Sequence, residues 1–217
     1  MKSRAAFAIV ALWAATAGAA GLPALEPDER RRLERGETIL HERPVANYSW
    51  PEIVAYRRSA ASASAVMAVY AQFGTHAEYI PGIVRSDVLA REASNAFRIL
   101  YEHEVAGPNE RYTVIMHVTR VDDGWDARWS LVTARYARRL EGGLRVLARA
   151  DGSLLVYRSR VDPGLLGVTF GTPSSVATGV AQTTQAVAMR AEGLAASDPA
   201  RLASLIEALE ALVRRGP

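Results

Sequence analysis

A short run of ionisable side chains, "YEHEV" at residues 101–105, sets a histidine between two glutamates. Two carboxylates and an imidazole could together hold a metal ion or transfer a proton. In an extended strand, however, successive side chains point to opposite faces of the sheet. His103 then shares a face with Tyr101, while Glu102 and Glu104 share the other face, about 6.6 Å apart at a rise of ~3.3 Å per residue. A regular strand therefore excludes a local three-residue site.

The two glutamates predict a solvated outer face on which carboxylates pair with arginines of a neighbouring strand. His103 has three interpretations: a core histidine hydrogen-bonded to tyrosine or backbone, a polar anchor for the head group of an apolar ligand, or a general acid or base. The other histidines, His41, His76 and His117, lack the spacing of metal ligands, and the chain has no cysteine. We therefore expect no metal site and no cofactor.

Inward-facing positions on the neighbouring segments form a consistent apolar row. Tyr112, Val114 and Met116 alternate on one face, and aromatic residues recur at the same period further along the chain. Such rows are typical either of a packed core or of a ligand cavity with a few polar groups. The candidate ligand-binding residues are Tyr101, His103, Tyr112, Met116, Trp129, Leu131, Tyr157 and Thr183.

The elements that position these residues follow from the hydrophobic period. Between residues 83 and 161 the period is two, and turn sequences such as "GPNE", "DDG" and "DG" separate the apolar runs. Connections this short make successive strands antiparallel neighbours, and Gly142-Gly143 indicates a bulge or a bend. The predicted strands cover residues 83–91, 96–105, 111–121, 125–135, 140–150 and 154–161.

Helical patterns flank this meander. A short exposed helix is predicted within residues 22–36. Two extended segments follow at 38–45 and 53–60, and then a second helix for which Ser62 or Ser64 can be the N-cap. Thr172 and Pro173 start a long helix that reaches about residue 194, and a leucine stripe from residue 198 onward predicts a final docked helix. The order indicates an α+β fold, in which a curved antiparallel sheet is wrapped around the long C-terminal helix.

The first twenty residues have the features of a signal peptide: Lys2 and Arg4, an apolar run, and Ala17-Gly18-Ala19 as a small-x-small cleavage site. We expect export, and a periplasmic or secreted protein without a lipid-modified cysteine. The predicted division is 1–20 signal peptide, 21–49 N-terminal extension, 50–196 main domain and 197–217 additional C-terminal helix.

Charge gives little indication of a macromolecular partner. Cleavage after Ala19 removes two of the 26 basic residues and none of the 23 acids, so the net charge becomes 24 − 23 = +1. No polybasic run supports nucleic-acid binding. Arg135, Arg138 and Arg139 could hold a phosphate or carboxylate, or could pair with Glu102, Glu104 or Glu141.

Two passages resemble the START-like (SRPBCC) superfamily, which includes polyketide cyclases and coenzyme Q-binding proteins. "AVYAQFGTHAEYIPGIVRS" at 68–86 is similar to that family's passage from helix to strand, with Phe73, Glu78, Pro81 and Ile83 in the expected places. "GSLLVYRSRVDPG" at 152–164 is similar to its last strand and following loop. The resemblance spans about residues 50–195 and implies a helix-grip fold with a hydrophobic cavity between the sheet and the long helix.

The resemblance implies binding of a lipid, quinone, sterol or polyketide-like molecule, and an exported carrier is the leading hypothesis. One alternative is a cyclase- or hydrolase-type enzyme that uses His103 with Tyr101 or Tyr112. Another is a module that docks a protein partner through its final helix and the loop after residue 164. Leu165, Leu166 and Phe170 in that loop could instead contact a membrane transiently.

Overall fold

A computed structural model of the chain describes residues 25–164 and 171–214. The predicted signal peptide and the loop with Leu165, Leu166 and Phe170 lie outside these ranges. The strands are β1 (Ile39–Arg43), β2 (Glu52–Ser59), β3 (Ile83–Ala93), β4 (Ala96–His103), β5 (Glu110–Val121), β6 (Gly124–Ala134), β7 (Arg139–Arg149) and β8 (Gly152–Asp162). The helices are α1 (Pro27–Glu34), α2 (Ala63–Tyr70), the 3₁₀ helix η1 (Phe73–Glu78), α4 (Pro173–Ser197) and α5 (Pro199–Arg214).

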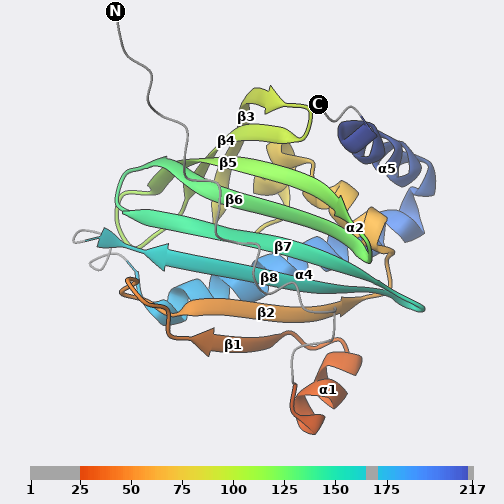
Figure 1. The fold of residues 1–217 in the computed structure, drawn as a ribbon, viewed down its shortest axis with the longest axis horizontal. Helices are drawn as coiled ribbons and strands as arrows, with labels where there is room; N and C mark the ends of the chain where they lie inside the picture. The colour runs from red at the N-terminus through yellow and green to blue at the C-terminus, as the bar shows by residue number, and fades with distance from the viewer. Residues whose placement is uncertain (1–24, 165–170, 215–217) are drawn as a thin grey trace, which may run out of the picture.

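The strands form one antiparallel sheet of eight strands, ordered β1-β2-β8-β7-β6-β5-β4-β3. Strands β3 to β8 are successive neighbours, as the short turns between them predict, and β8 pairs with β2 to bring in the N-terminal strands. The long helix α4 crosses one face of the sheet (Figure 1). The α+β architecture expected from the sequence is confirmed.

Helix α4 begins where its capping residues predict. Thr172 Oγ1 accepts a hydrogen bond from the Ser175 amide at 3.1 Å, and Pro173 occupies the first turn, where no amide donor is needed. Val180, Thr183 and Val187 are buried on the side that faces the sheet. The main core lies between this inner face of the sheet, α2 and α4.

Helix α5 packs against α2 and extends that core. Leu202 and Leu209 are buried, and the other members of the predicted stripe, Leu205, Ile206 and Leu212, are half-buried against the same cluster. The prediction that this helix docks is confirmed. Removing it would expose core leucines, so α5 contributes to the stability of the domain itself.

The N-terminal segment packs on the opposite face of the sheet from α4. Leu25, which precedes α1, and Leu33 within it are buried against Val54, Tyr56 and other residues of β1, β2, β7 and β8. Strand β1, which falls within the region expected to be an extension, is part of the sheet. The extension is therefore integrated into the fold from Leu25 onward.

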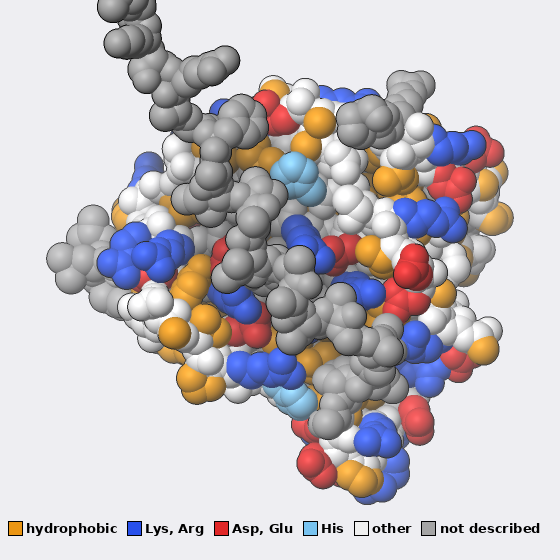
Figure 2. Space-filling view, in the orientation of Figure 1, with side chains coloured by type: hydrophobic (Ala, Val, Ile, Leu, Met, Phe, Trp, Pro, Cys, Tyr) orange, Lys and Arg blue, Asp and Glu red, His pale blue; other side chains and the backbone are white. Residues whose placement is uncertain are grey.

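Basic and acidic side chains are interspersed on the face of the sheet away from α4 (Figure 2). Glu102 pairs with Arg111 on β5 at 2.8 Å, as predicted for an outer carboxylate. Glu104 lies beyond the end of β4, so it does not continue that outer row. The two glutamates thus have different environments.

The expected pairing of the arginine cluster with Glu102, Glu104 or Glu141 is wrong for the described residues. Arg138 donates to Asp162 Oδ2 at 2.9 Å, and Asp162 is almost fully buried. Arg135 and Arg139 donate instead to the backbone carbonyls of Asn109 and Asn47. The turn geometry brings these carbonyls close, which charge counting along a strand cannot anticipate.

Candidate ligand-binding site

A cavity of about 950 Å³ lies between the inner face of the sheet and α4. This volume is at the upper end of the ~300–1,000 Å³ of typical small-molecule sites. One end, here called the loop end, is lined by Glu110 at the start of β5 and by residues of the segments that follow β4, β6 and β8: Glu104, Val105, Ala106, Tyr136, Ala137 and Pro163. The remainder, here called the enclosed part, is lined by buried side chains that include Tyr70, His76, Tyr101, Met116, Trp129 and Thr183.

The structure brings together seven of the eight candidate residues. Tyr101, His103, Tyr112, Met116, Trp129, Tyr157 and Thr183 all line the cavity. Leu131 does not; it lies where the pairing of β5 with β6 shifts by one residue, since Val114 pairs with Leu131 but Thr113 pairs with Thr133. The extra residue, Val132, interrupts strict alternation at this position. Ligand binding by the seven lining residues stays a prediction.

A buried hydrogen-bonded chain involves His76, a residue that sequence reasoning set aside. Its Nε2 lies 2.7 Å from the Tyr70 carbonyl oxygen, which can only accept, so Nε2 carries the proton. Its Nδ1 therefore accepts from the Tyr101 hydroxyl at 2.9 Å. No spacing rule links residues 76 and 101, so the sequence offers no signal for this contact.

Burial keeps the histidines and tyrosines of the cavity uncharged near neutral pH. Desolvation lowers the pKa of His76 to about 4, against a smaller opposing effect of its hydrogen bond to Tyr70. Burial also lowers the pKa of His103. The pKa values of Tyr101, Tyr112 and Tyr157 are raised by the same loss of hydration.

His103 stacks on Tyr112, with ring centroids 6.2 Å apart and ring planes 17° from parallel. Its other side packs on Gly82, where an added Cβ would lie 3.3 Å from two ring atoms. The side chains of His103 and Tyr112 make no hydrogen bond with any described residue, and both face the cavity. The interpretation of a hydrogen-bonded core histidine thus fits His76, while His103 offers a free polar edge.

Trp129 forms one wall of the cavity and rests on Tyr157, with ring centroids 5.1 Å apart. It occupies this place because Gly142, its partner on β7, has no side chain. A Cβ at Gly142 would lie 2.3 Å from the Arg158 carbonyl oxygen and 2.4 Å from the indole ring. The pairings of β7 with β6 and with β8 run through Gly142 and Gly143 without a register shift, so the predicted bulge does not form. Gly142 instead makes room for the wall of the cavity.

We expect Gly142→Ala to lower the free energy of unfolding by about 1–3 kcal/mol, the usual cost of overpacking. Urea unfolding monitored by tryptophan fluorescence measures the change. Gly74→Ala is the matched control, because nothing lies within 4 Å of a Cβ at that position. Equal stabilities of the two variants would contradict this account of Gly142.

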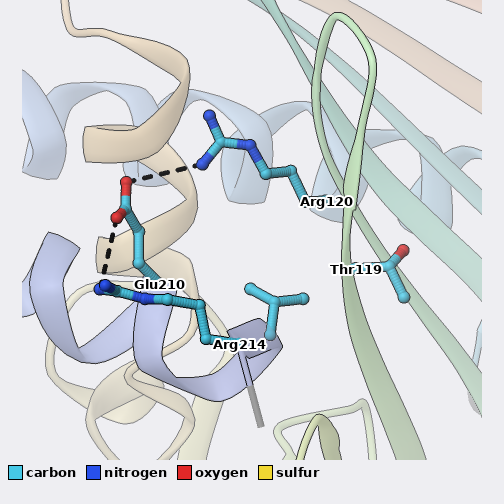
Figure 3. Close-up of a pocket in the computed structure, with 5 residues that line it drawn as sticks. Thr119, Arg120, Glu210 and Arg214 are labelled. Atoms are coloured by element: carbon cyan, nitrogen blue, oxygen red, sulfur yellow. Dashed lines mark ion pairs between the residues drawn. The ribbon is translucent and has the colours of Figure 1, made fainter. Parts of the chain in front are cut away.

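A second hollow lies on the surface between β5 and α5 (Figure 3). Its volume is about 500 Å³, and Glu210 lies between Arg120 and Arg214, 3.5 Å from each. The shared carboxylate offsets part of the charge of both arginines, and apolar lining is limited to Val213. This groove has neither the enclosure nor the apolar surface of the main cavity.

The described residues give no sign of a metal centre. They include no cluster of three or more histidine, aspartate or glutamate side chains close enough to hold an ion. None of the helices in 25–164 and 171–214 contains a stretch both long and apolar enough to cross a bilayer.

Several solved structures share this architecture. A STAR-related lipid transfer protein from Xanthomonas axonopodis superposes with a TM-score of 0.62 at 18% identity, covering 71% of this chain and 93% of that chain. Human StAR-related lipid transfer protein 5 superposes with a TM-score of 0.60 at 9% identity, covering 73% of this chain and 84% of that chain. The human StarD13 lipid transfer and protein localization domain superposes with a TM-score of 0.53 at 12% identity, covering 76% of this chain and 92% of that chain.

These superpositions establish the fold: the chain has a helix-grip fold like that of the START-related lipid transfer structures, as the two sequence passages indicated. No protein-family model matches the sequence, and no curated protein matches it either. At identities below 20%, the likeness establishes the fold and leaves ligand and activity to be argued from the cavity.

Proposed function

We propose that this protein binds and carries a hydrophobic small molecule in the cavity between the sheet and α4. The observation that carries the proposal is the cavity itself, about 950 Å³ in volume and lined mainly by apolar and aromatic side chains. Each Å² of apolar ligand surface buried there contributes about 25 cal/mol, so binding needs no catalytic group. A lipid, quinone, sterol or polyketide-like molecule has the required chemistry.

Two further features support a role as a carrier. The solved structures with this fold named above are described as lipid transfer proteins or domains. The N-terminal sequence has the features of an export signal, so we place the carrier in the periplasm or outside the cell. A transient membrane contact through Leu165, Leu166 and Phe170 would provide a route for ligand exchange.

Native mass spectrometry of protein purified from its own compartment tests the proposal. We expect a bound lipophile, released by organic extraction, or one-to-one uptake of an added lipophilic dye such as Nile red. Repeated absence of both would overturn the proposal, because a carrier of hydrophobic molecules must bind one in its cavity.

An enzyme that uses His103 is the second candidate, favoured by the free polar edge of that residue in the cavity. It requires a variant that separates binding from turnover. His103→Ala should then still take up Nile red while losing substrate conversion. Unchanged conversion in that variant would remove the candidate.

His103→Phe is expected to weaken binding of dodecan-1-ol by about two- to twelvefold, since a hydrogen bond contributes about 0.5–1.5 kcal/mol. The free energy of unfolding should stay equal or rise by up to ~1 kcal/mol, because an unpartnered polar ring leaves the interior. Tyr101→Phe is the contrasting variant: it removes the hydrogen bond to His76 and should lower stability by about 1 kcal/mol. Dye displacement measures the ligand affinity of each variant, and urea unfolding measures its stability. A loss of stability in His103→Phe comparable to that in Tyr101→Phe would contradict the view that His103 makes no hydrogen bond in the folded protein.

A further inference from the structure

Charged side chains are distributed unevenly around the cavity. Among its described lining residues there is no arginine, and the only carboxylates are Glu104 and Glu110. Glu104 is exposed at the loop end. Glu110 is held by the backbone amides of Arg135 and Tyr136, at 2.9 and 3.0 Å. By composition, the segment 165–170, "LLGVTF", adds no ionisable side chain.

The nearby arginines are committed to other groups. Arg138 donates to Asp162, and Arg135 and Arg139 donate to the backbone carbonyls of Asn109 and Asn47, in the β4–β5 and β1–β2 connections. Arg190 on α4 lies over the Tyr79 ring and within 3.7 Å of Glu78. None of these guanidinium groups lines the cavity, so none is in place to neutralise an anion bound in the enclosed part.

The polar groups of the enclosed part are hydroxyls and the imidazoles of His76 and His103, which burial keeps neutral near pH 7. His76 uses both ring nitrogens, one on the Tyr70 carbonyl and one on the Tyr101 hydroxyl. The Thr183 hydroxyl makes no hydrogen bond with a described residue and faces the cavity. These groups can pair with a hydroxyl, carbonyl or ether oxygen, but they cannot balance a full charge.

We propose that the enclosed part of the cavity selects ligands whose inner end is uncharged, so that the cargo is a neutral lipophile or an amphiphile that keeps any charged group at the loop end. This inference rests on the proposed function and specifies its ligand class. Removing a carboxylate or ammonium from water without a counter-ion costs several kcal/mol. A cost of that size corresponds to about a hundredfold or more in affinity. Glu104 and Glu110 further favour a cation over an anion at the loop end.

A series of twelve-carbon chains with a polar group at each end tests the selection, because one end must then enter the cavity. The members are dodecane-1,12-diol, 12-aminododecan-1-ol, dodecane-1,12-diamine and dodecanedioate, each displacing Nile red at about pH 8, where the carboxylates and most of the amines are charged. We expect the diol and the amino alcohol to bind within about tenfold of each other. The diamine and the dioate should bind about a hundredfold more weakly.

The outcomes distinguish a failure of the proposed function from a failure of the charge selection. If Nile red does not bind, the proposed function fails. If Nile red binds but the dioate or the diamine displaces it as well as the diol does, the charge selection is wrong and the proposed function stands. Thr183→Arg supplies the missing cation in the enclosed part and should improve the dioate-to-diol affinity ratio by about tenfold or more, while the diamine stays excluded. Circular dichroism verifies that this variant folds, and the wild-type series is decisive without it.

Discussion

Replacing Thr183 with tryptophan is expected to abolish ligand binding while leaving the protein folded. Thr183 lies on the inner side of α4, is 9% exposed, and lines the cavity. An indole at this position has open volume to enter, so it fills the space that a ligand would occupy. We expect the affinity for Nile red to fall by about a hundredfold or more, because the apolar contact area with the ligand is lost.

The same substitution should change the free energy of unfolding by no more than about 1 kcal/mol, because new apolar contacts in the hollow offset small adjustments of α4. Met189→Trp is the matched control, since Met189 lies on the same helix and is 55% exposed. Dye titration and urea unfolding distinguish the variants. If Thr183→Trp unfolds the protein, the interior is packed; if it binds like the wild type, the ligand lies elsewhere.

The second large effect is a loss of stability in mild acid. The pKa of His76 is about 4 in the folded protein because burial disfavours the imidazolium, whereas an unfolded histidine has a pKa of about 6.5. Between these values the unfolded chain binds one more proton than the folded chain, so the free energy of unfolding falls as the pH falls. The contribution of neutral His76 to the free energy of unfolding, about 3 kcal/mol in total, is complete above about pH 6.5 and is lost by about pH 4.

The surroundings of His76 support this direction. Tyr70, Phe73, Tyr79 and Tyr101 pack their rings around it, and none can stabilise a positive charge by ionising near neutral pH. His103, whose pKa is also lowered by burial, shifts stability in the same direction. Carboxylates with lowered pKa values, such as Asp162, affect stability mainly below about pH 5. The interval from about pH 5 to 6.5 therefore reports chiefly on the buried histidines.

Urea unfolding at a series of pH values measures the slope of the free energy of unfolding against pH. His76→Asn should reduce it, while His117→Asn, which changes an exposed residue on β5, should leave it as in the wild type. A wild-type protein whose stability is constant across that interval would contradict the burial of a neutral His76, whatever the variants do.

The sequence predicted the architecture well because period-two alternation and short turns are local properties. The strands from β3 to β8, the capping of α4 by Thr172 and the docking of α5 all follow from neighbouring residues. Inward alternation likewise placed Tyr101, Met116 and Tyr157 on the face that lines the cavity. These predictions required no knowledge of distant contacts.

The errors come from contacts that only the folded chain creates. Leu131 lies outside the lining at the point where the β5–β6 pairing shifts by one residue, and no turn signal marks that bulge. His76 meets Tyr101 through η1, and Arg138 meets Asp162 through a turn. Glu104 leaves the outer row because β4 ends at His103. Each case depends on where a strand ends or slips, which alternation alone does not determine.

The central claim is that a lipophile lies between the sheet and α4, and photo-crosslinking tests it most directly. A dodecan-1-ol that carries a diazirine on its chain, irradiated with the protein and mapped by peptide mass spectrometry, should label inner-face residues such as Met116, Tyr157 and Val180. An excess of unlabelled dodecan-1-ol should suppress this labelling. Labels confined to exposed apolar positions such as Val88, Leu89 and Met189, or labelling that never saturates, would contradict the claim.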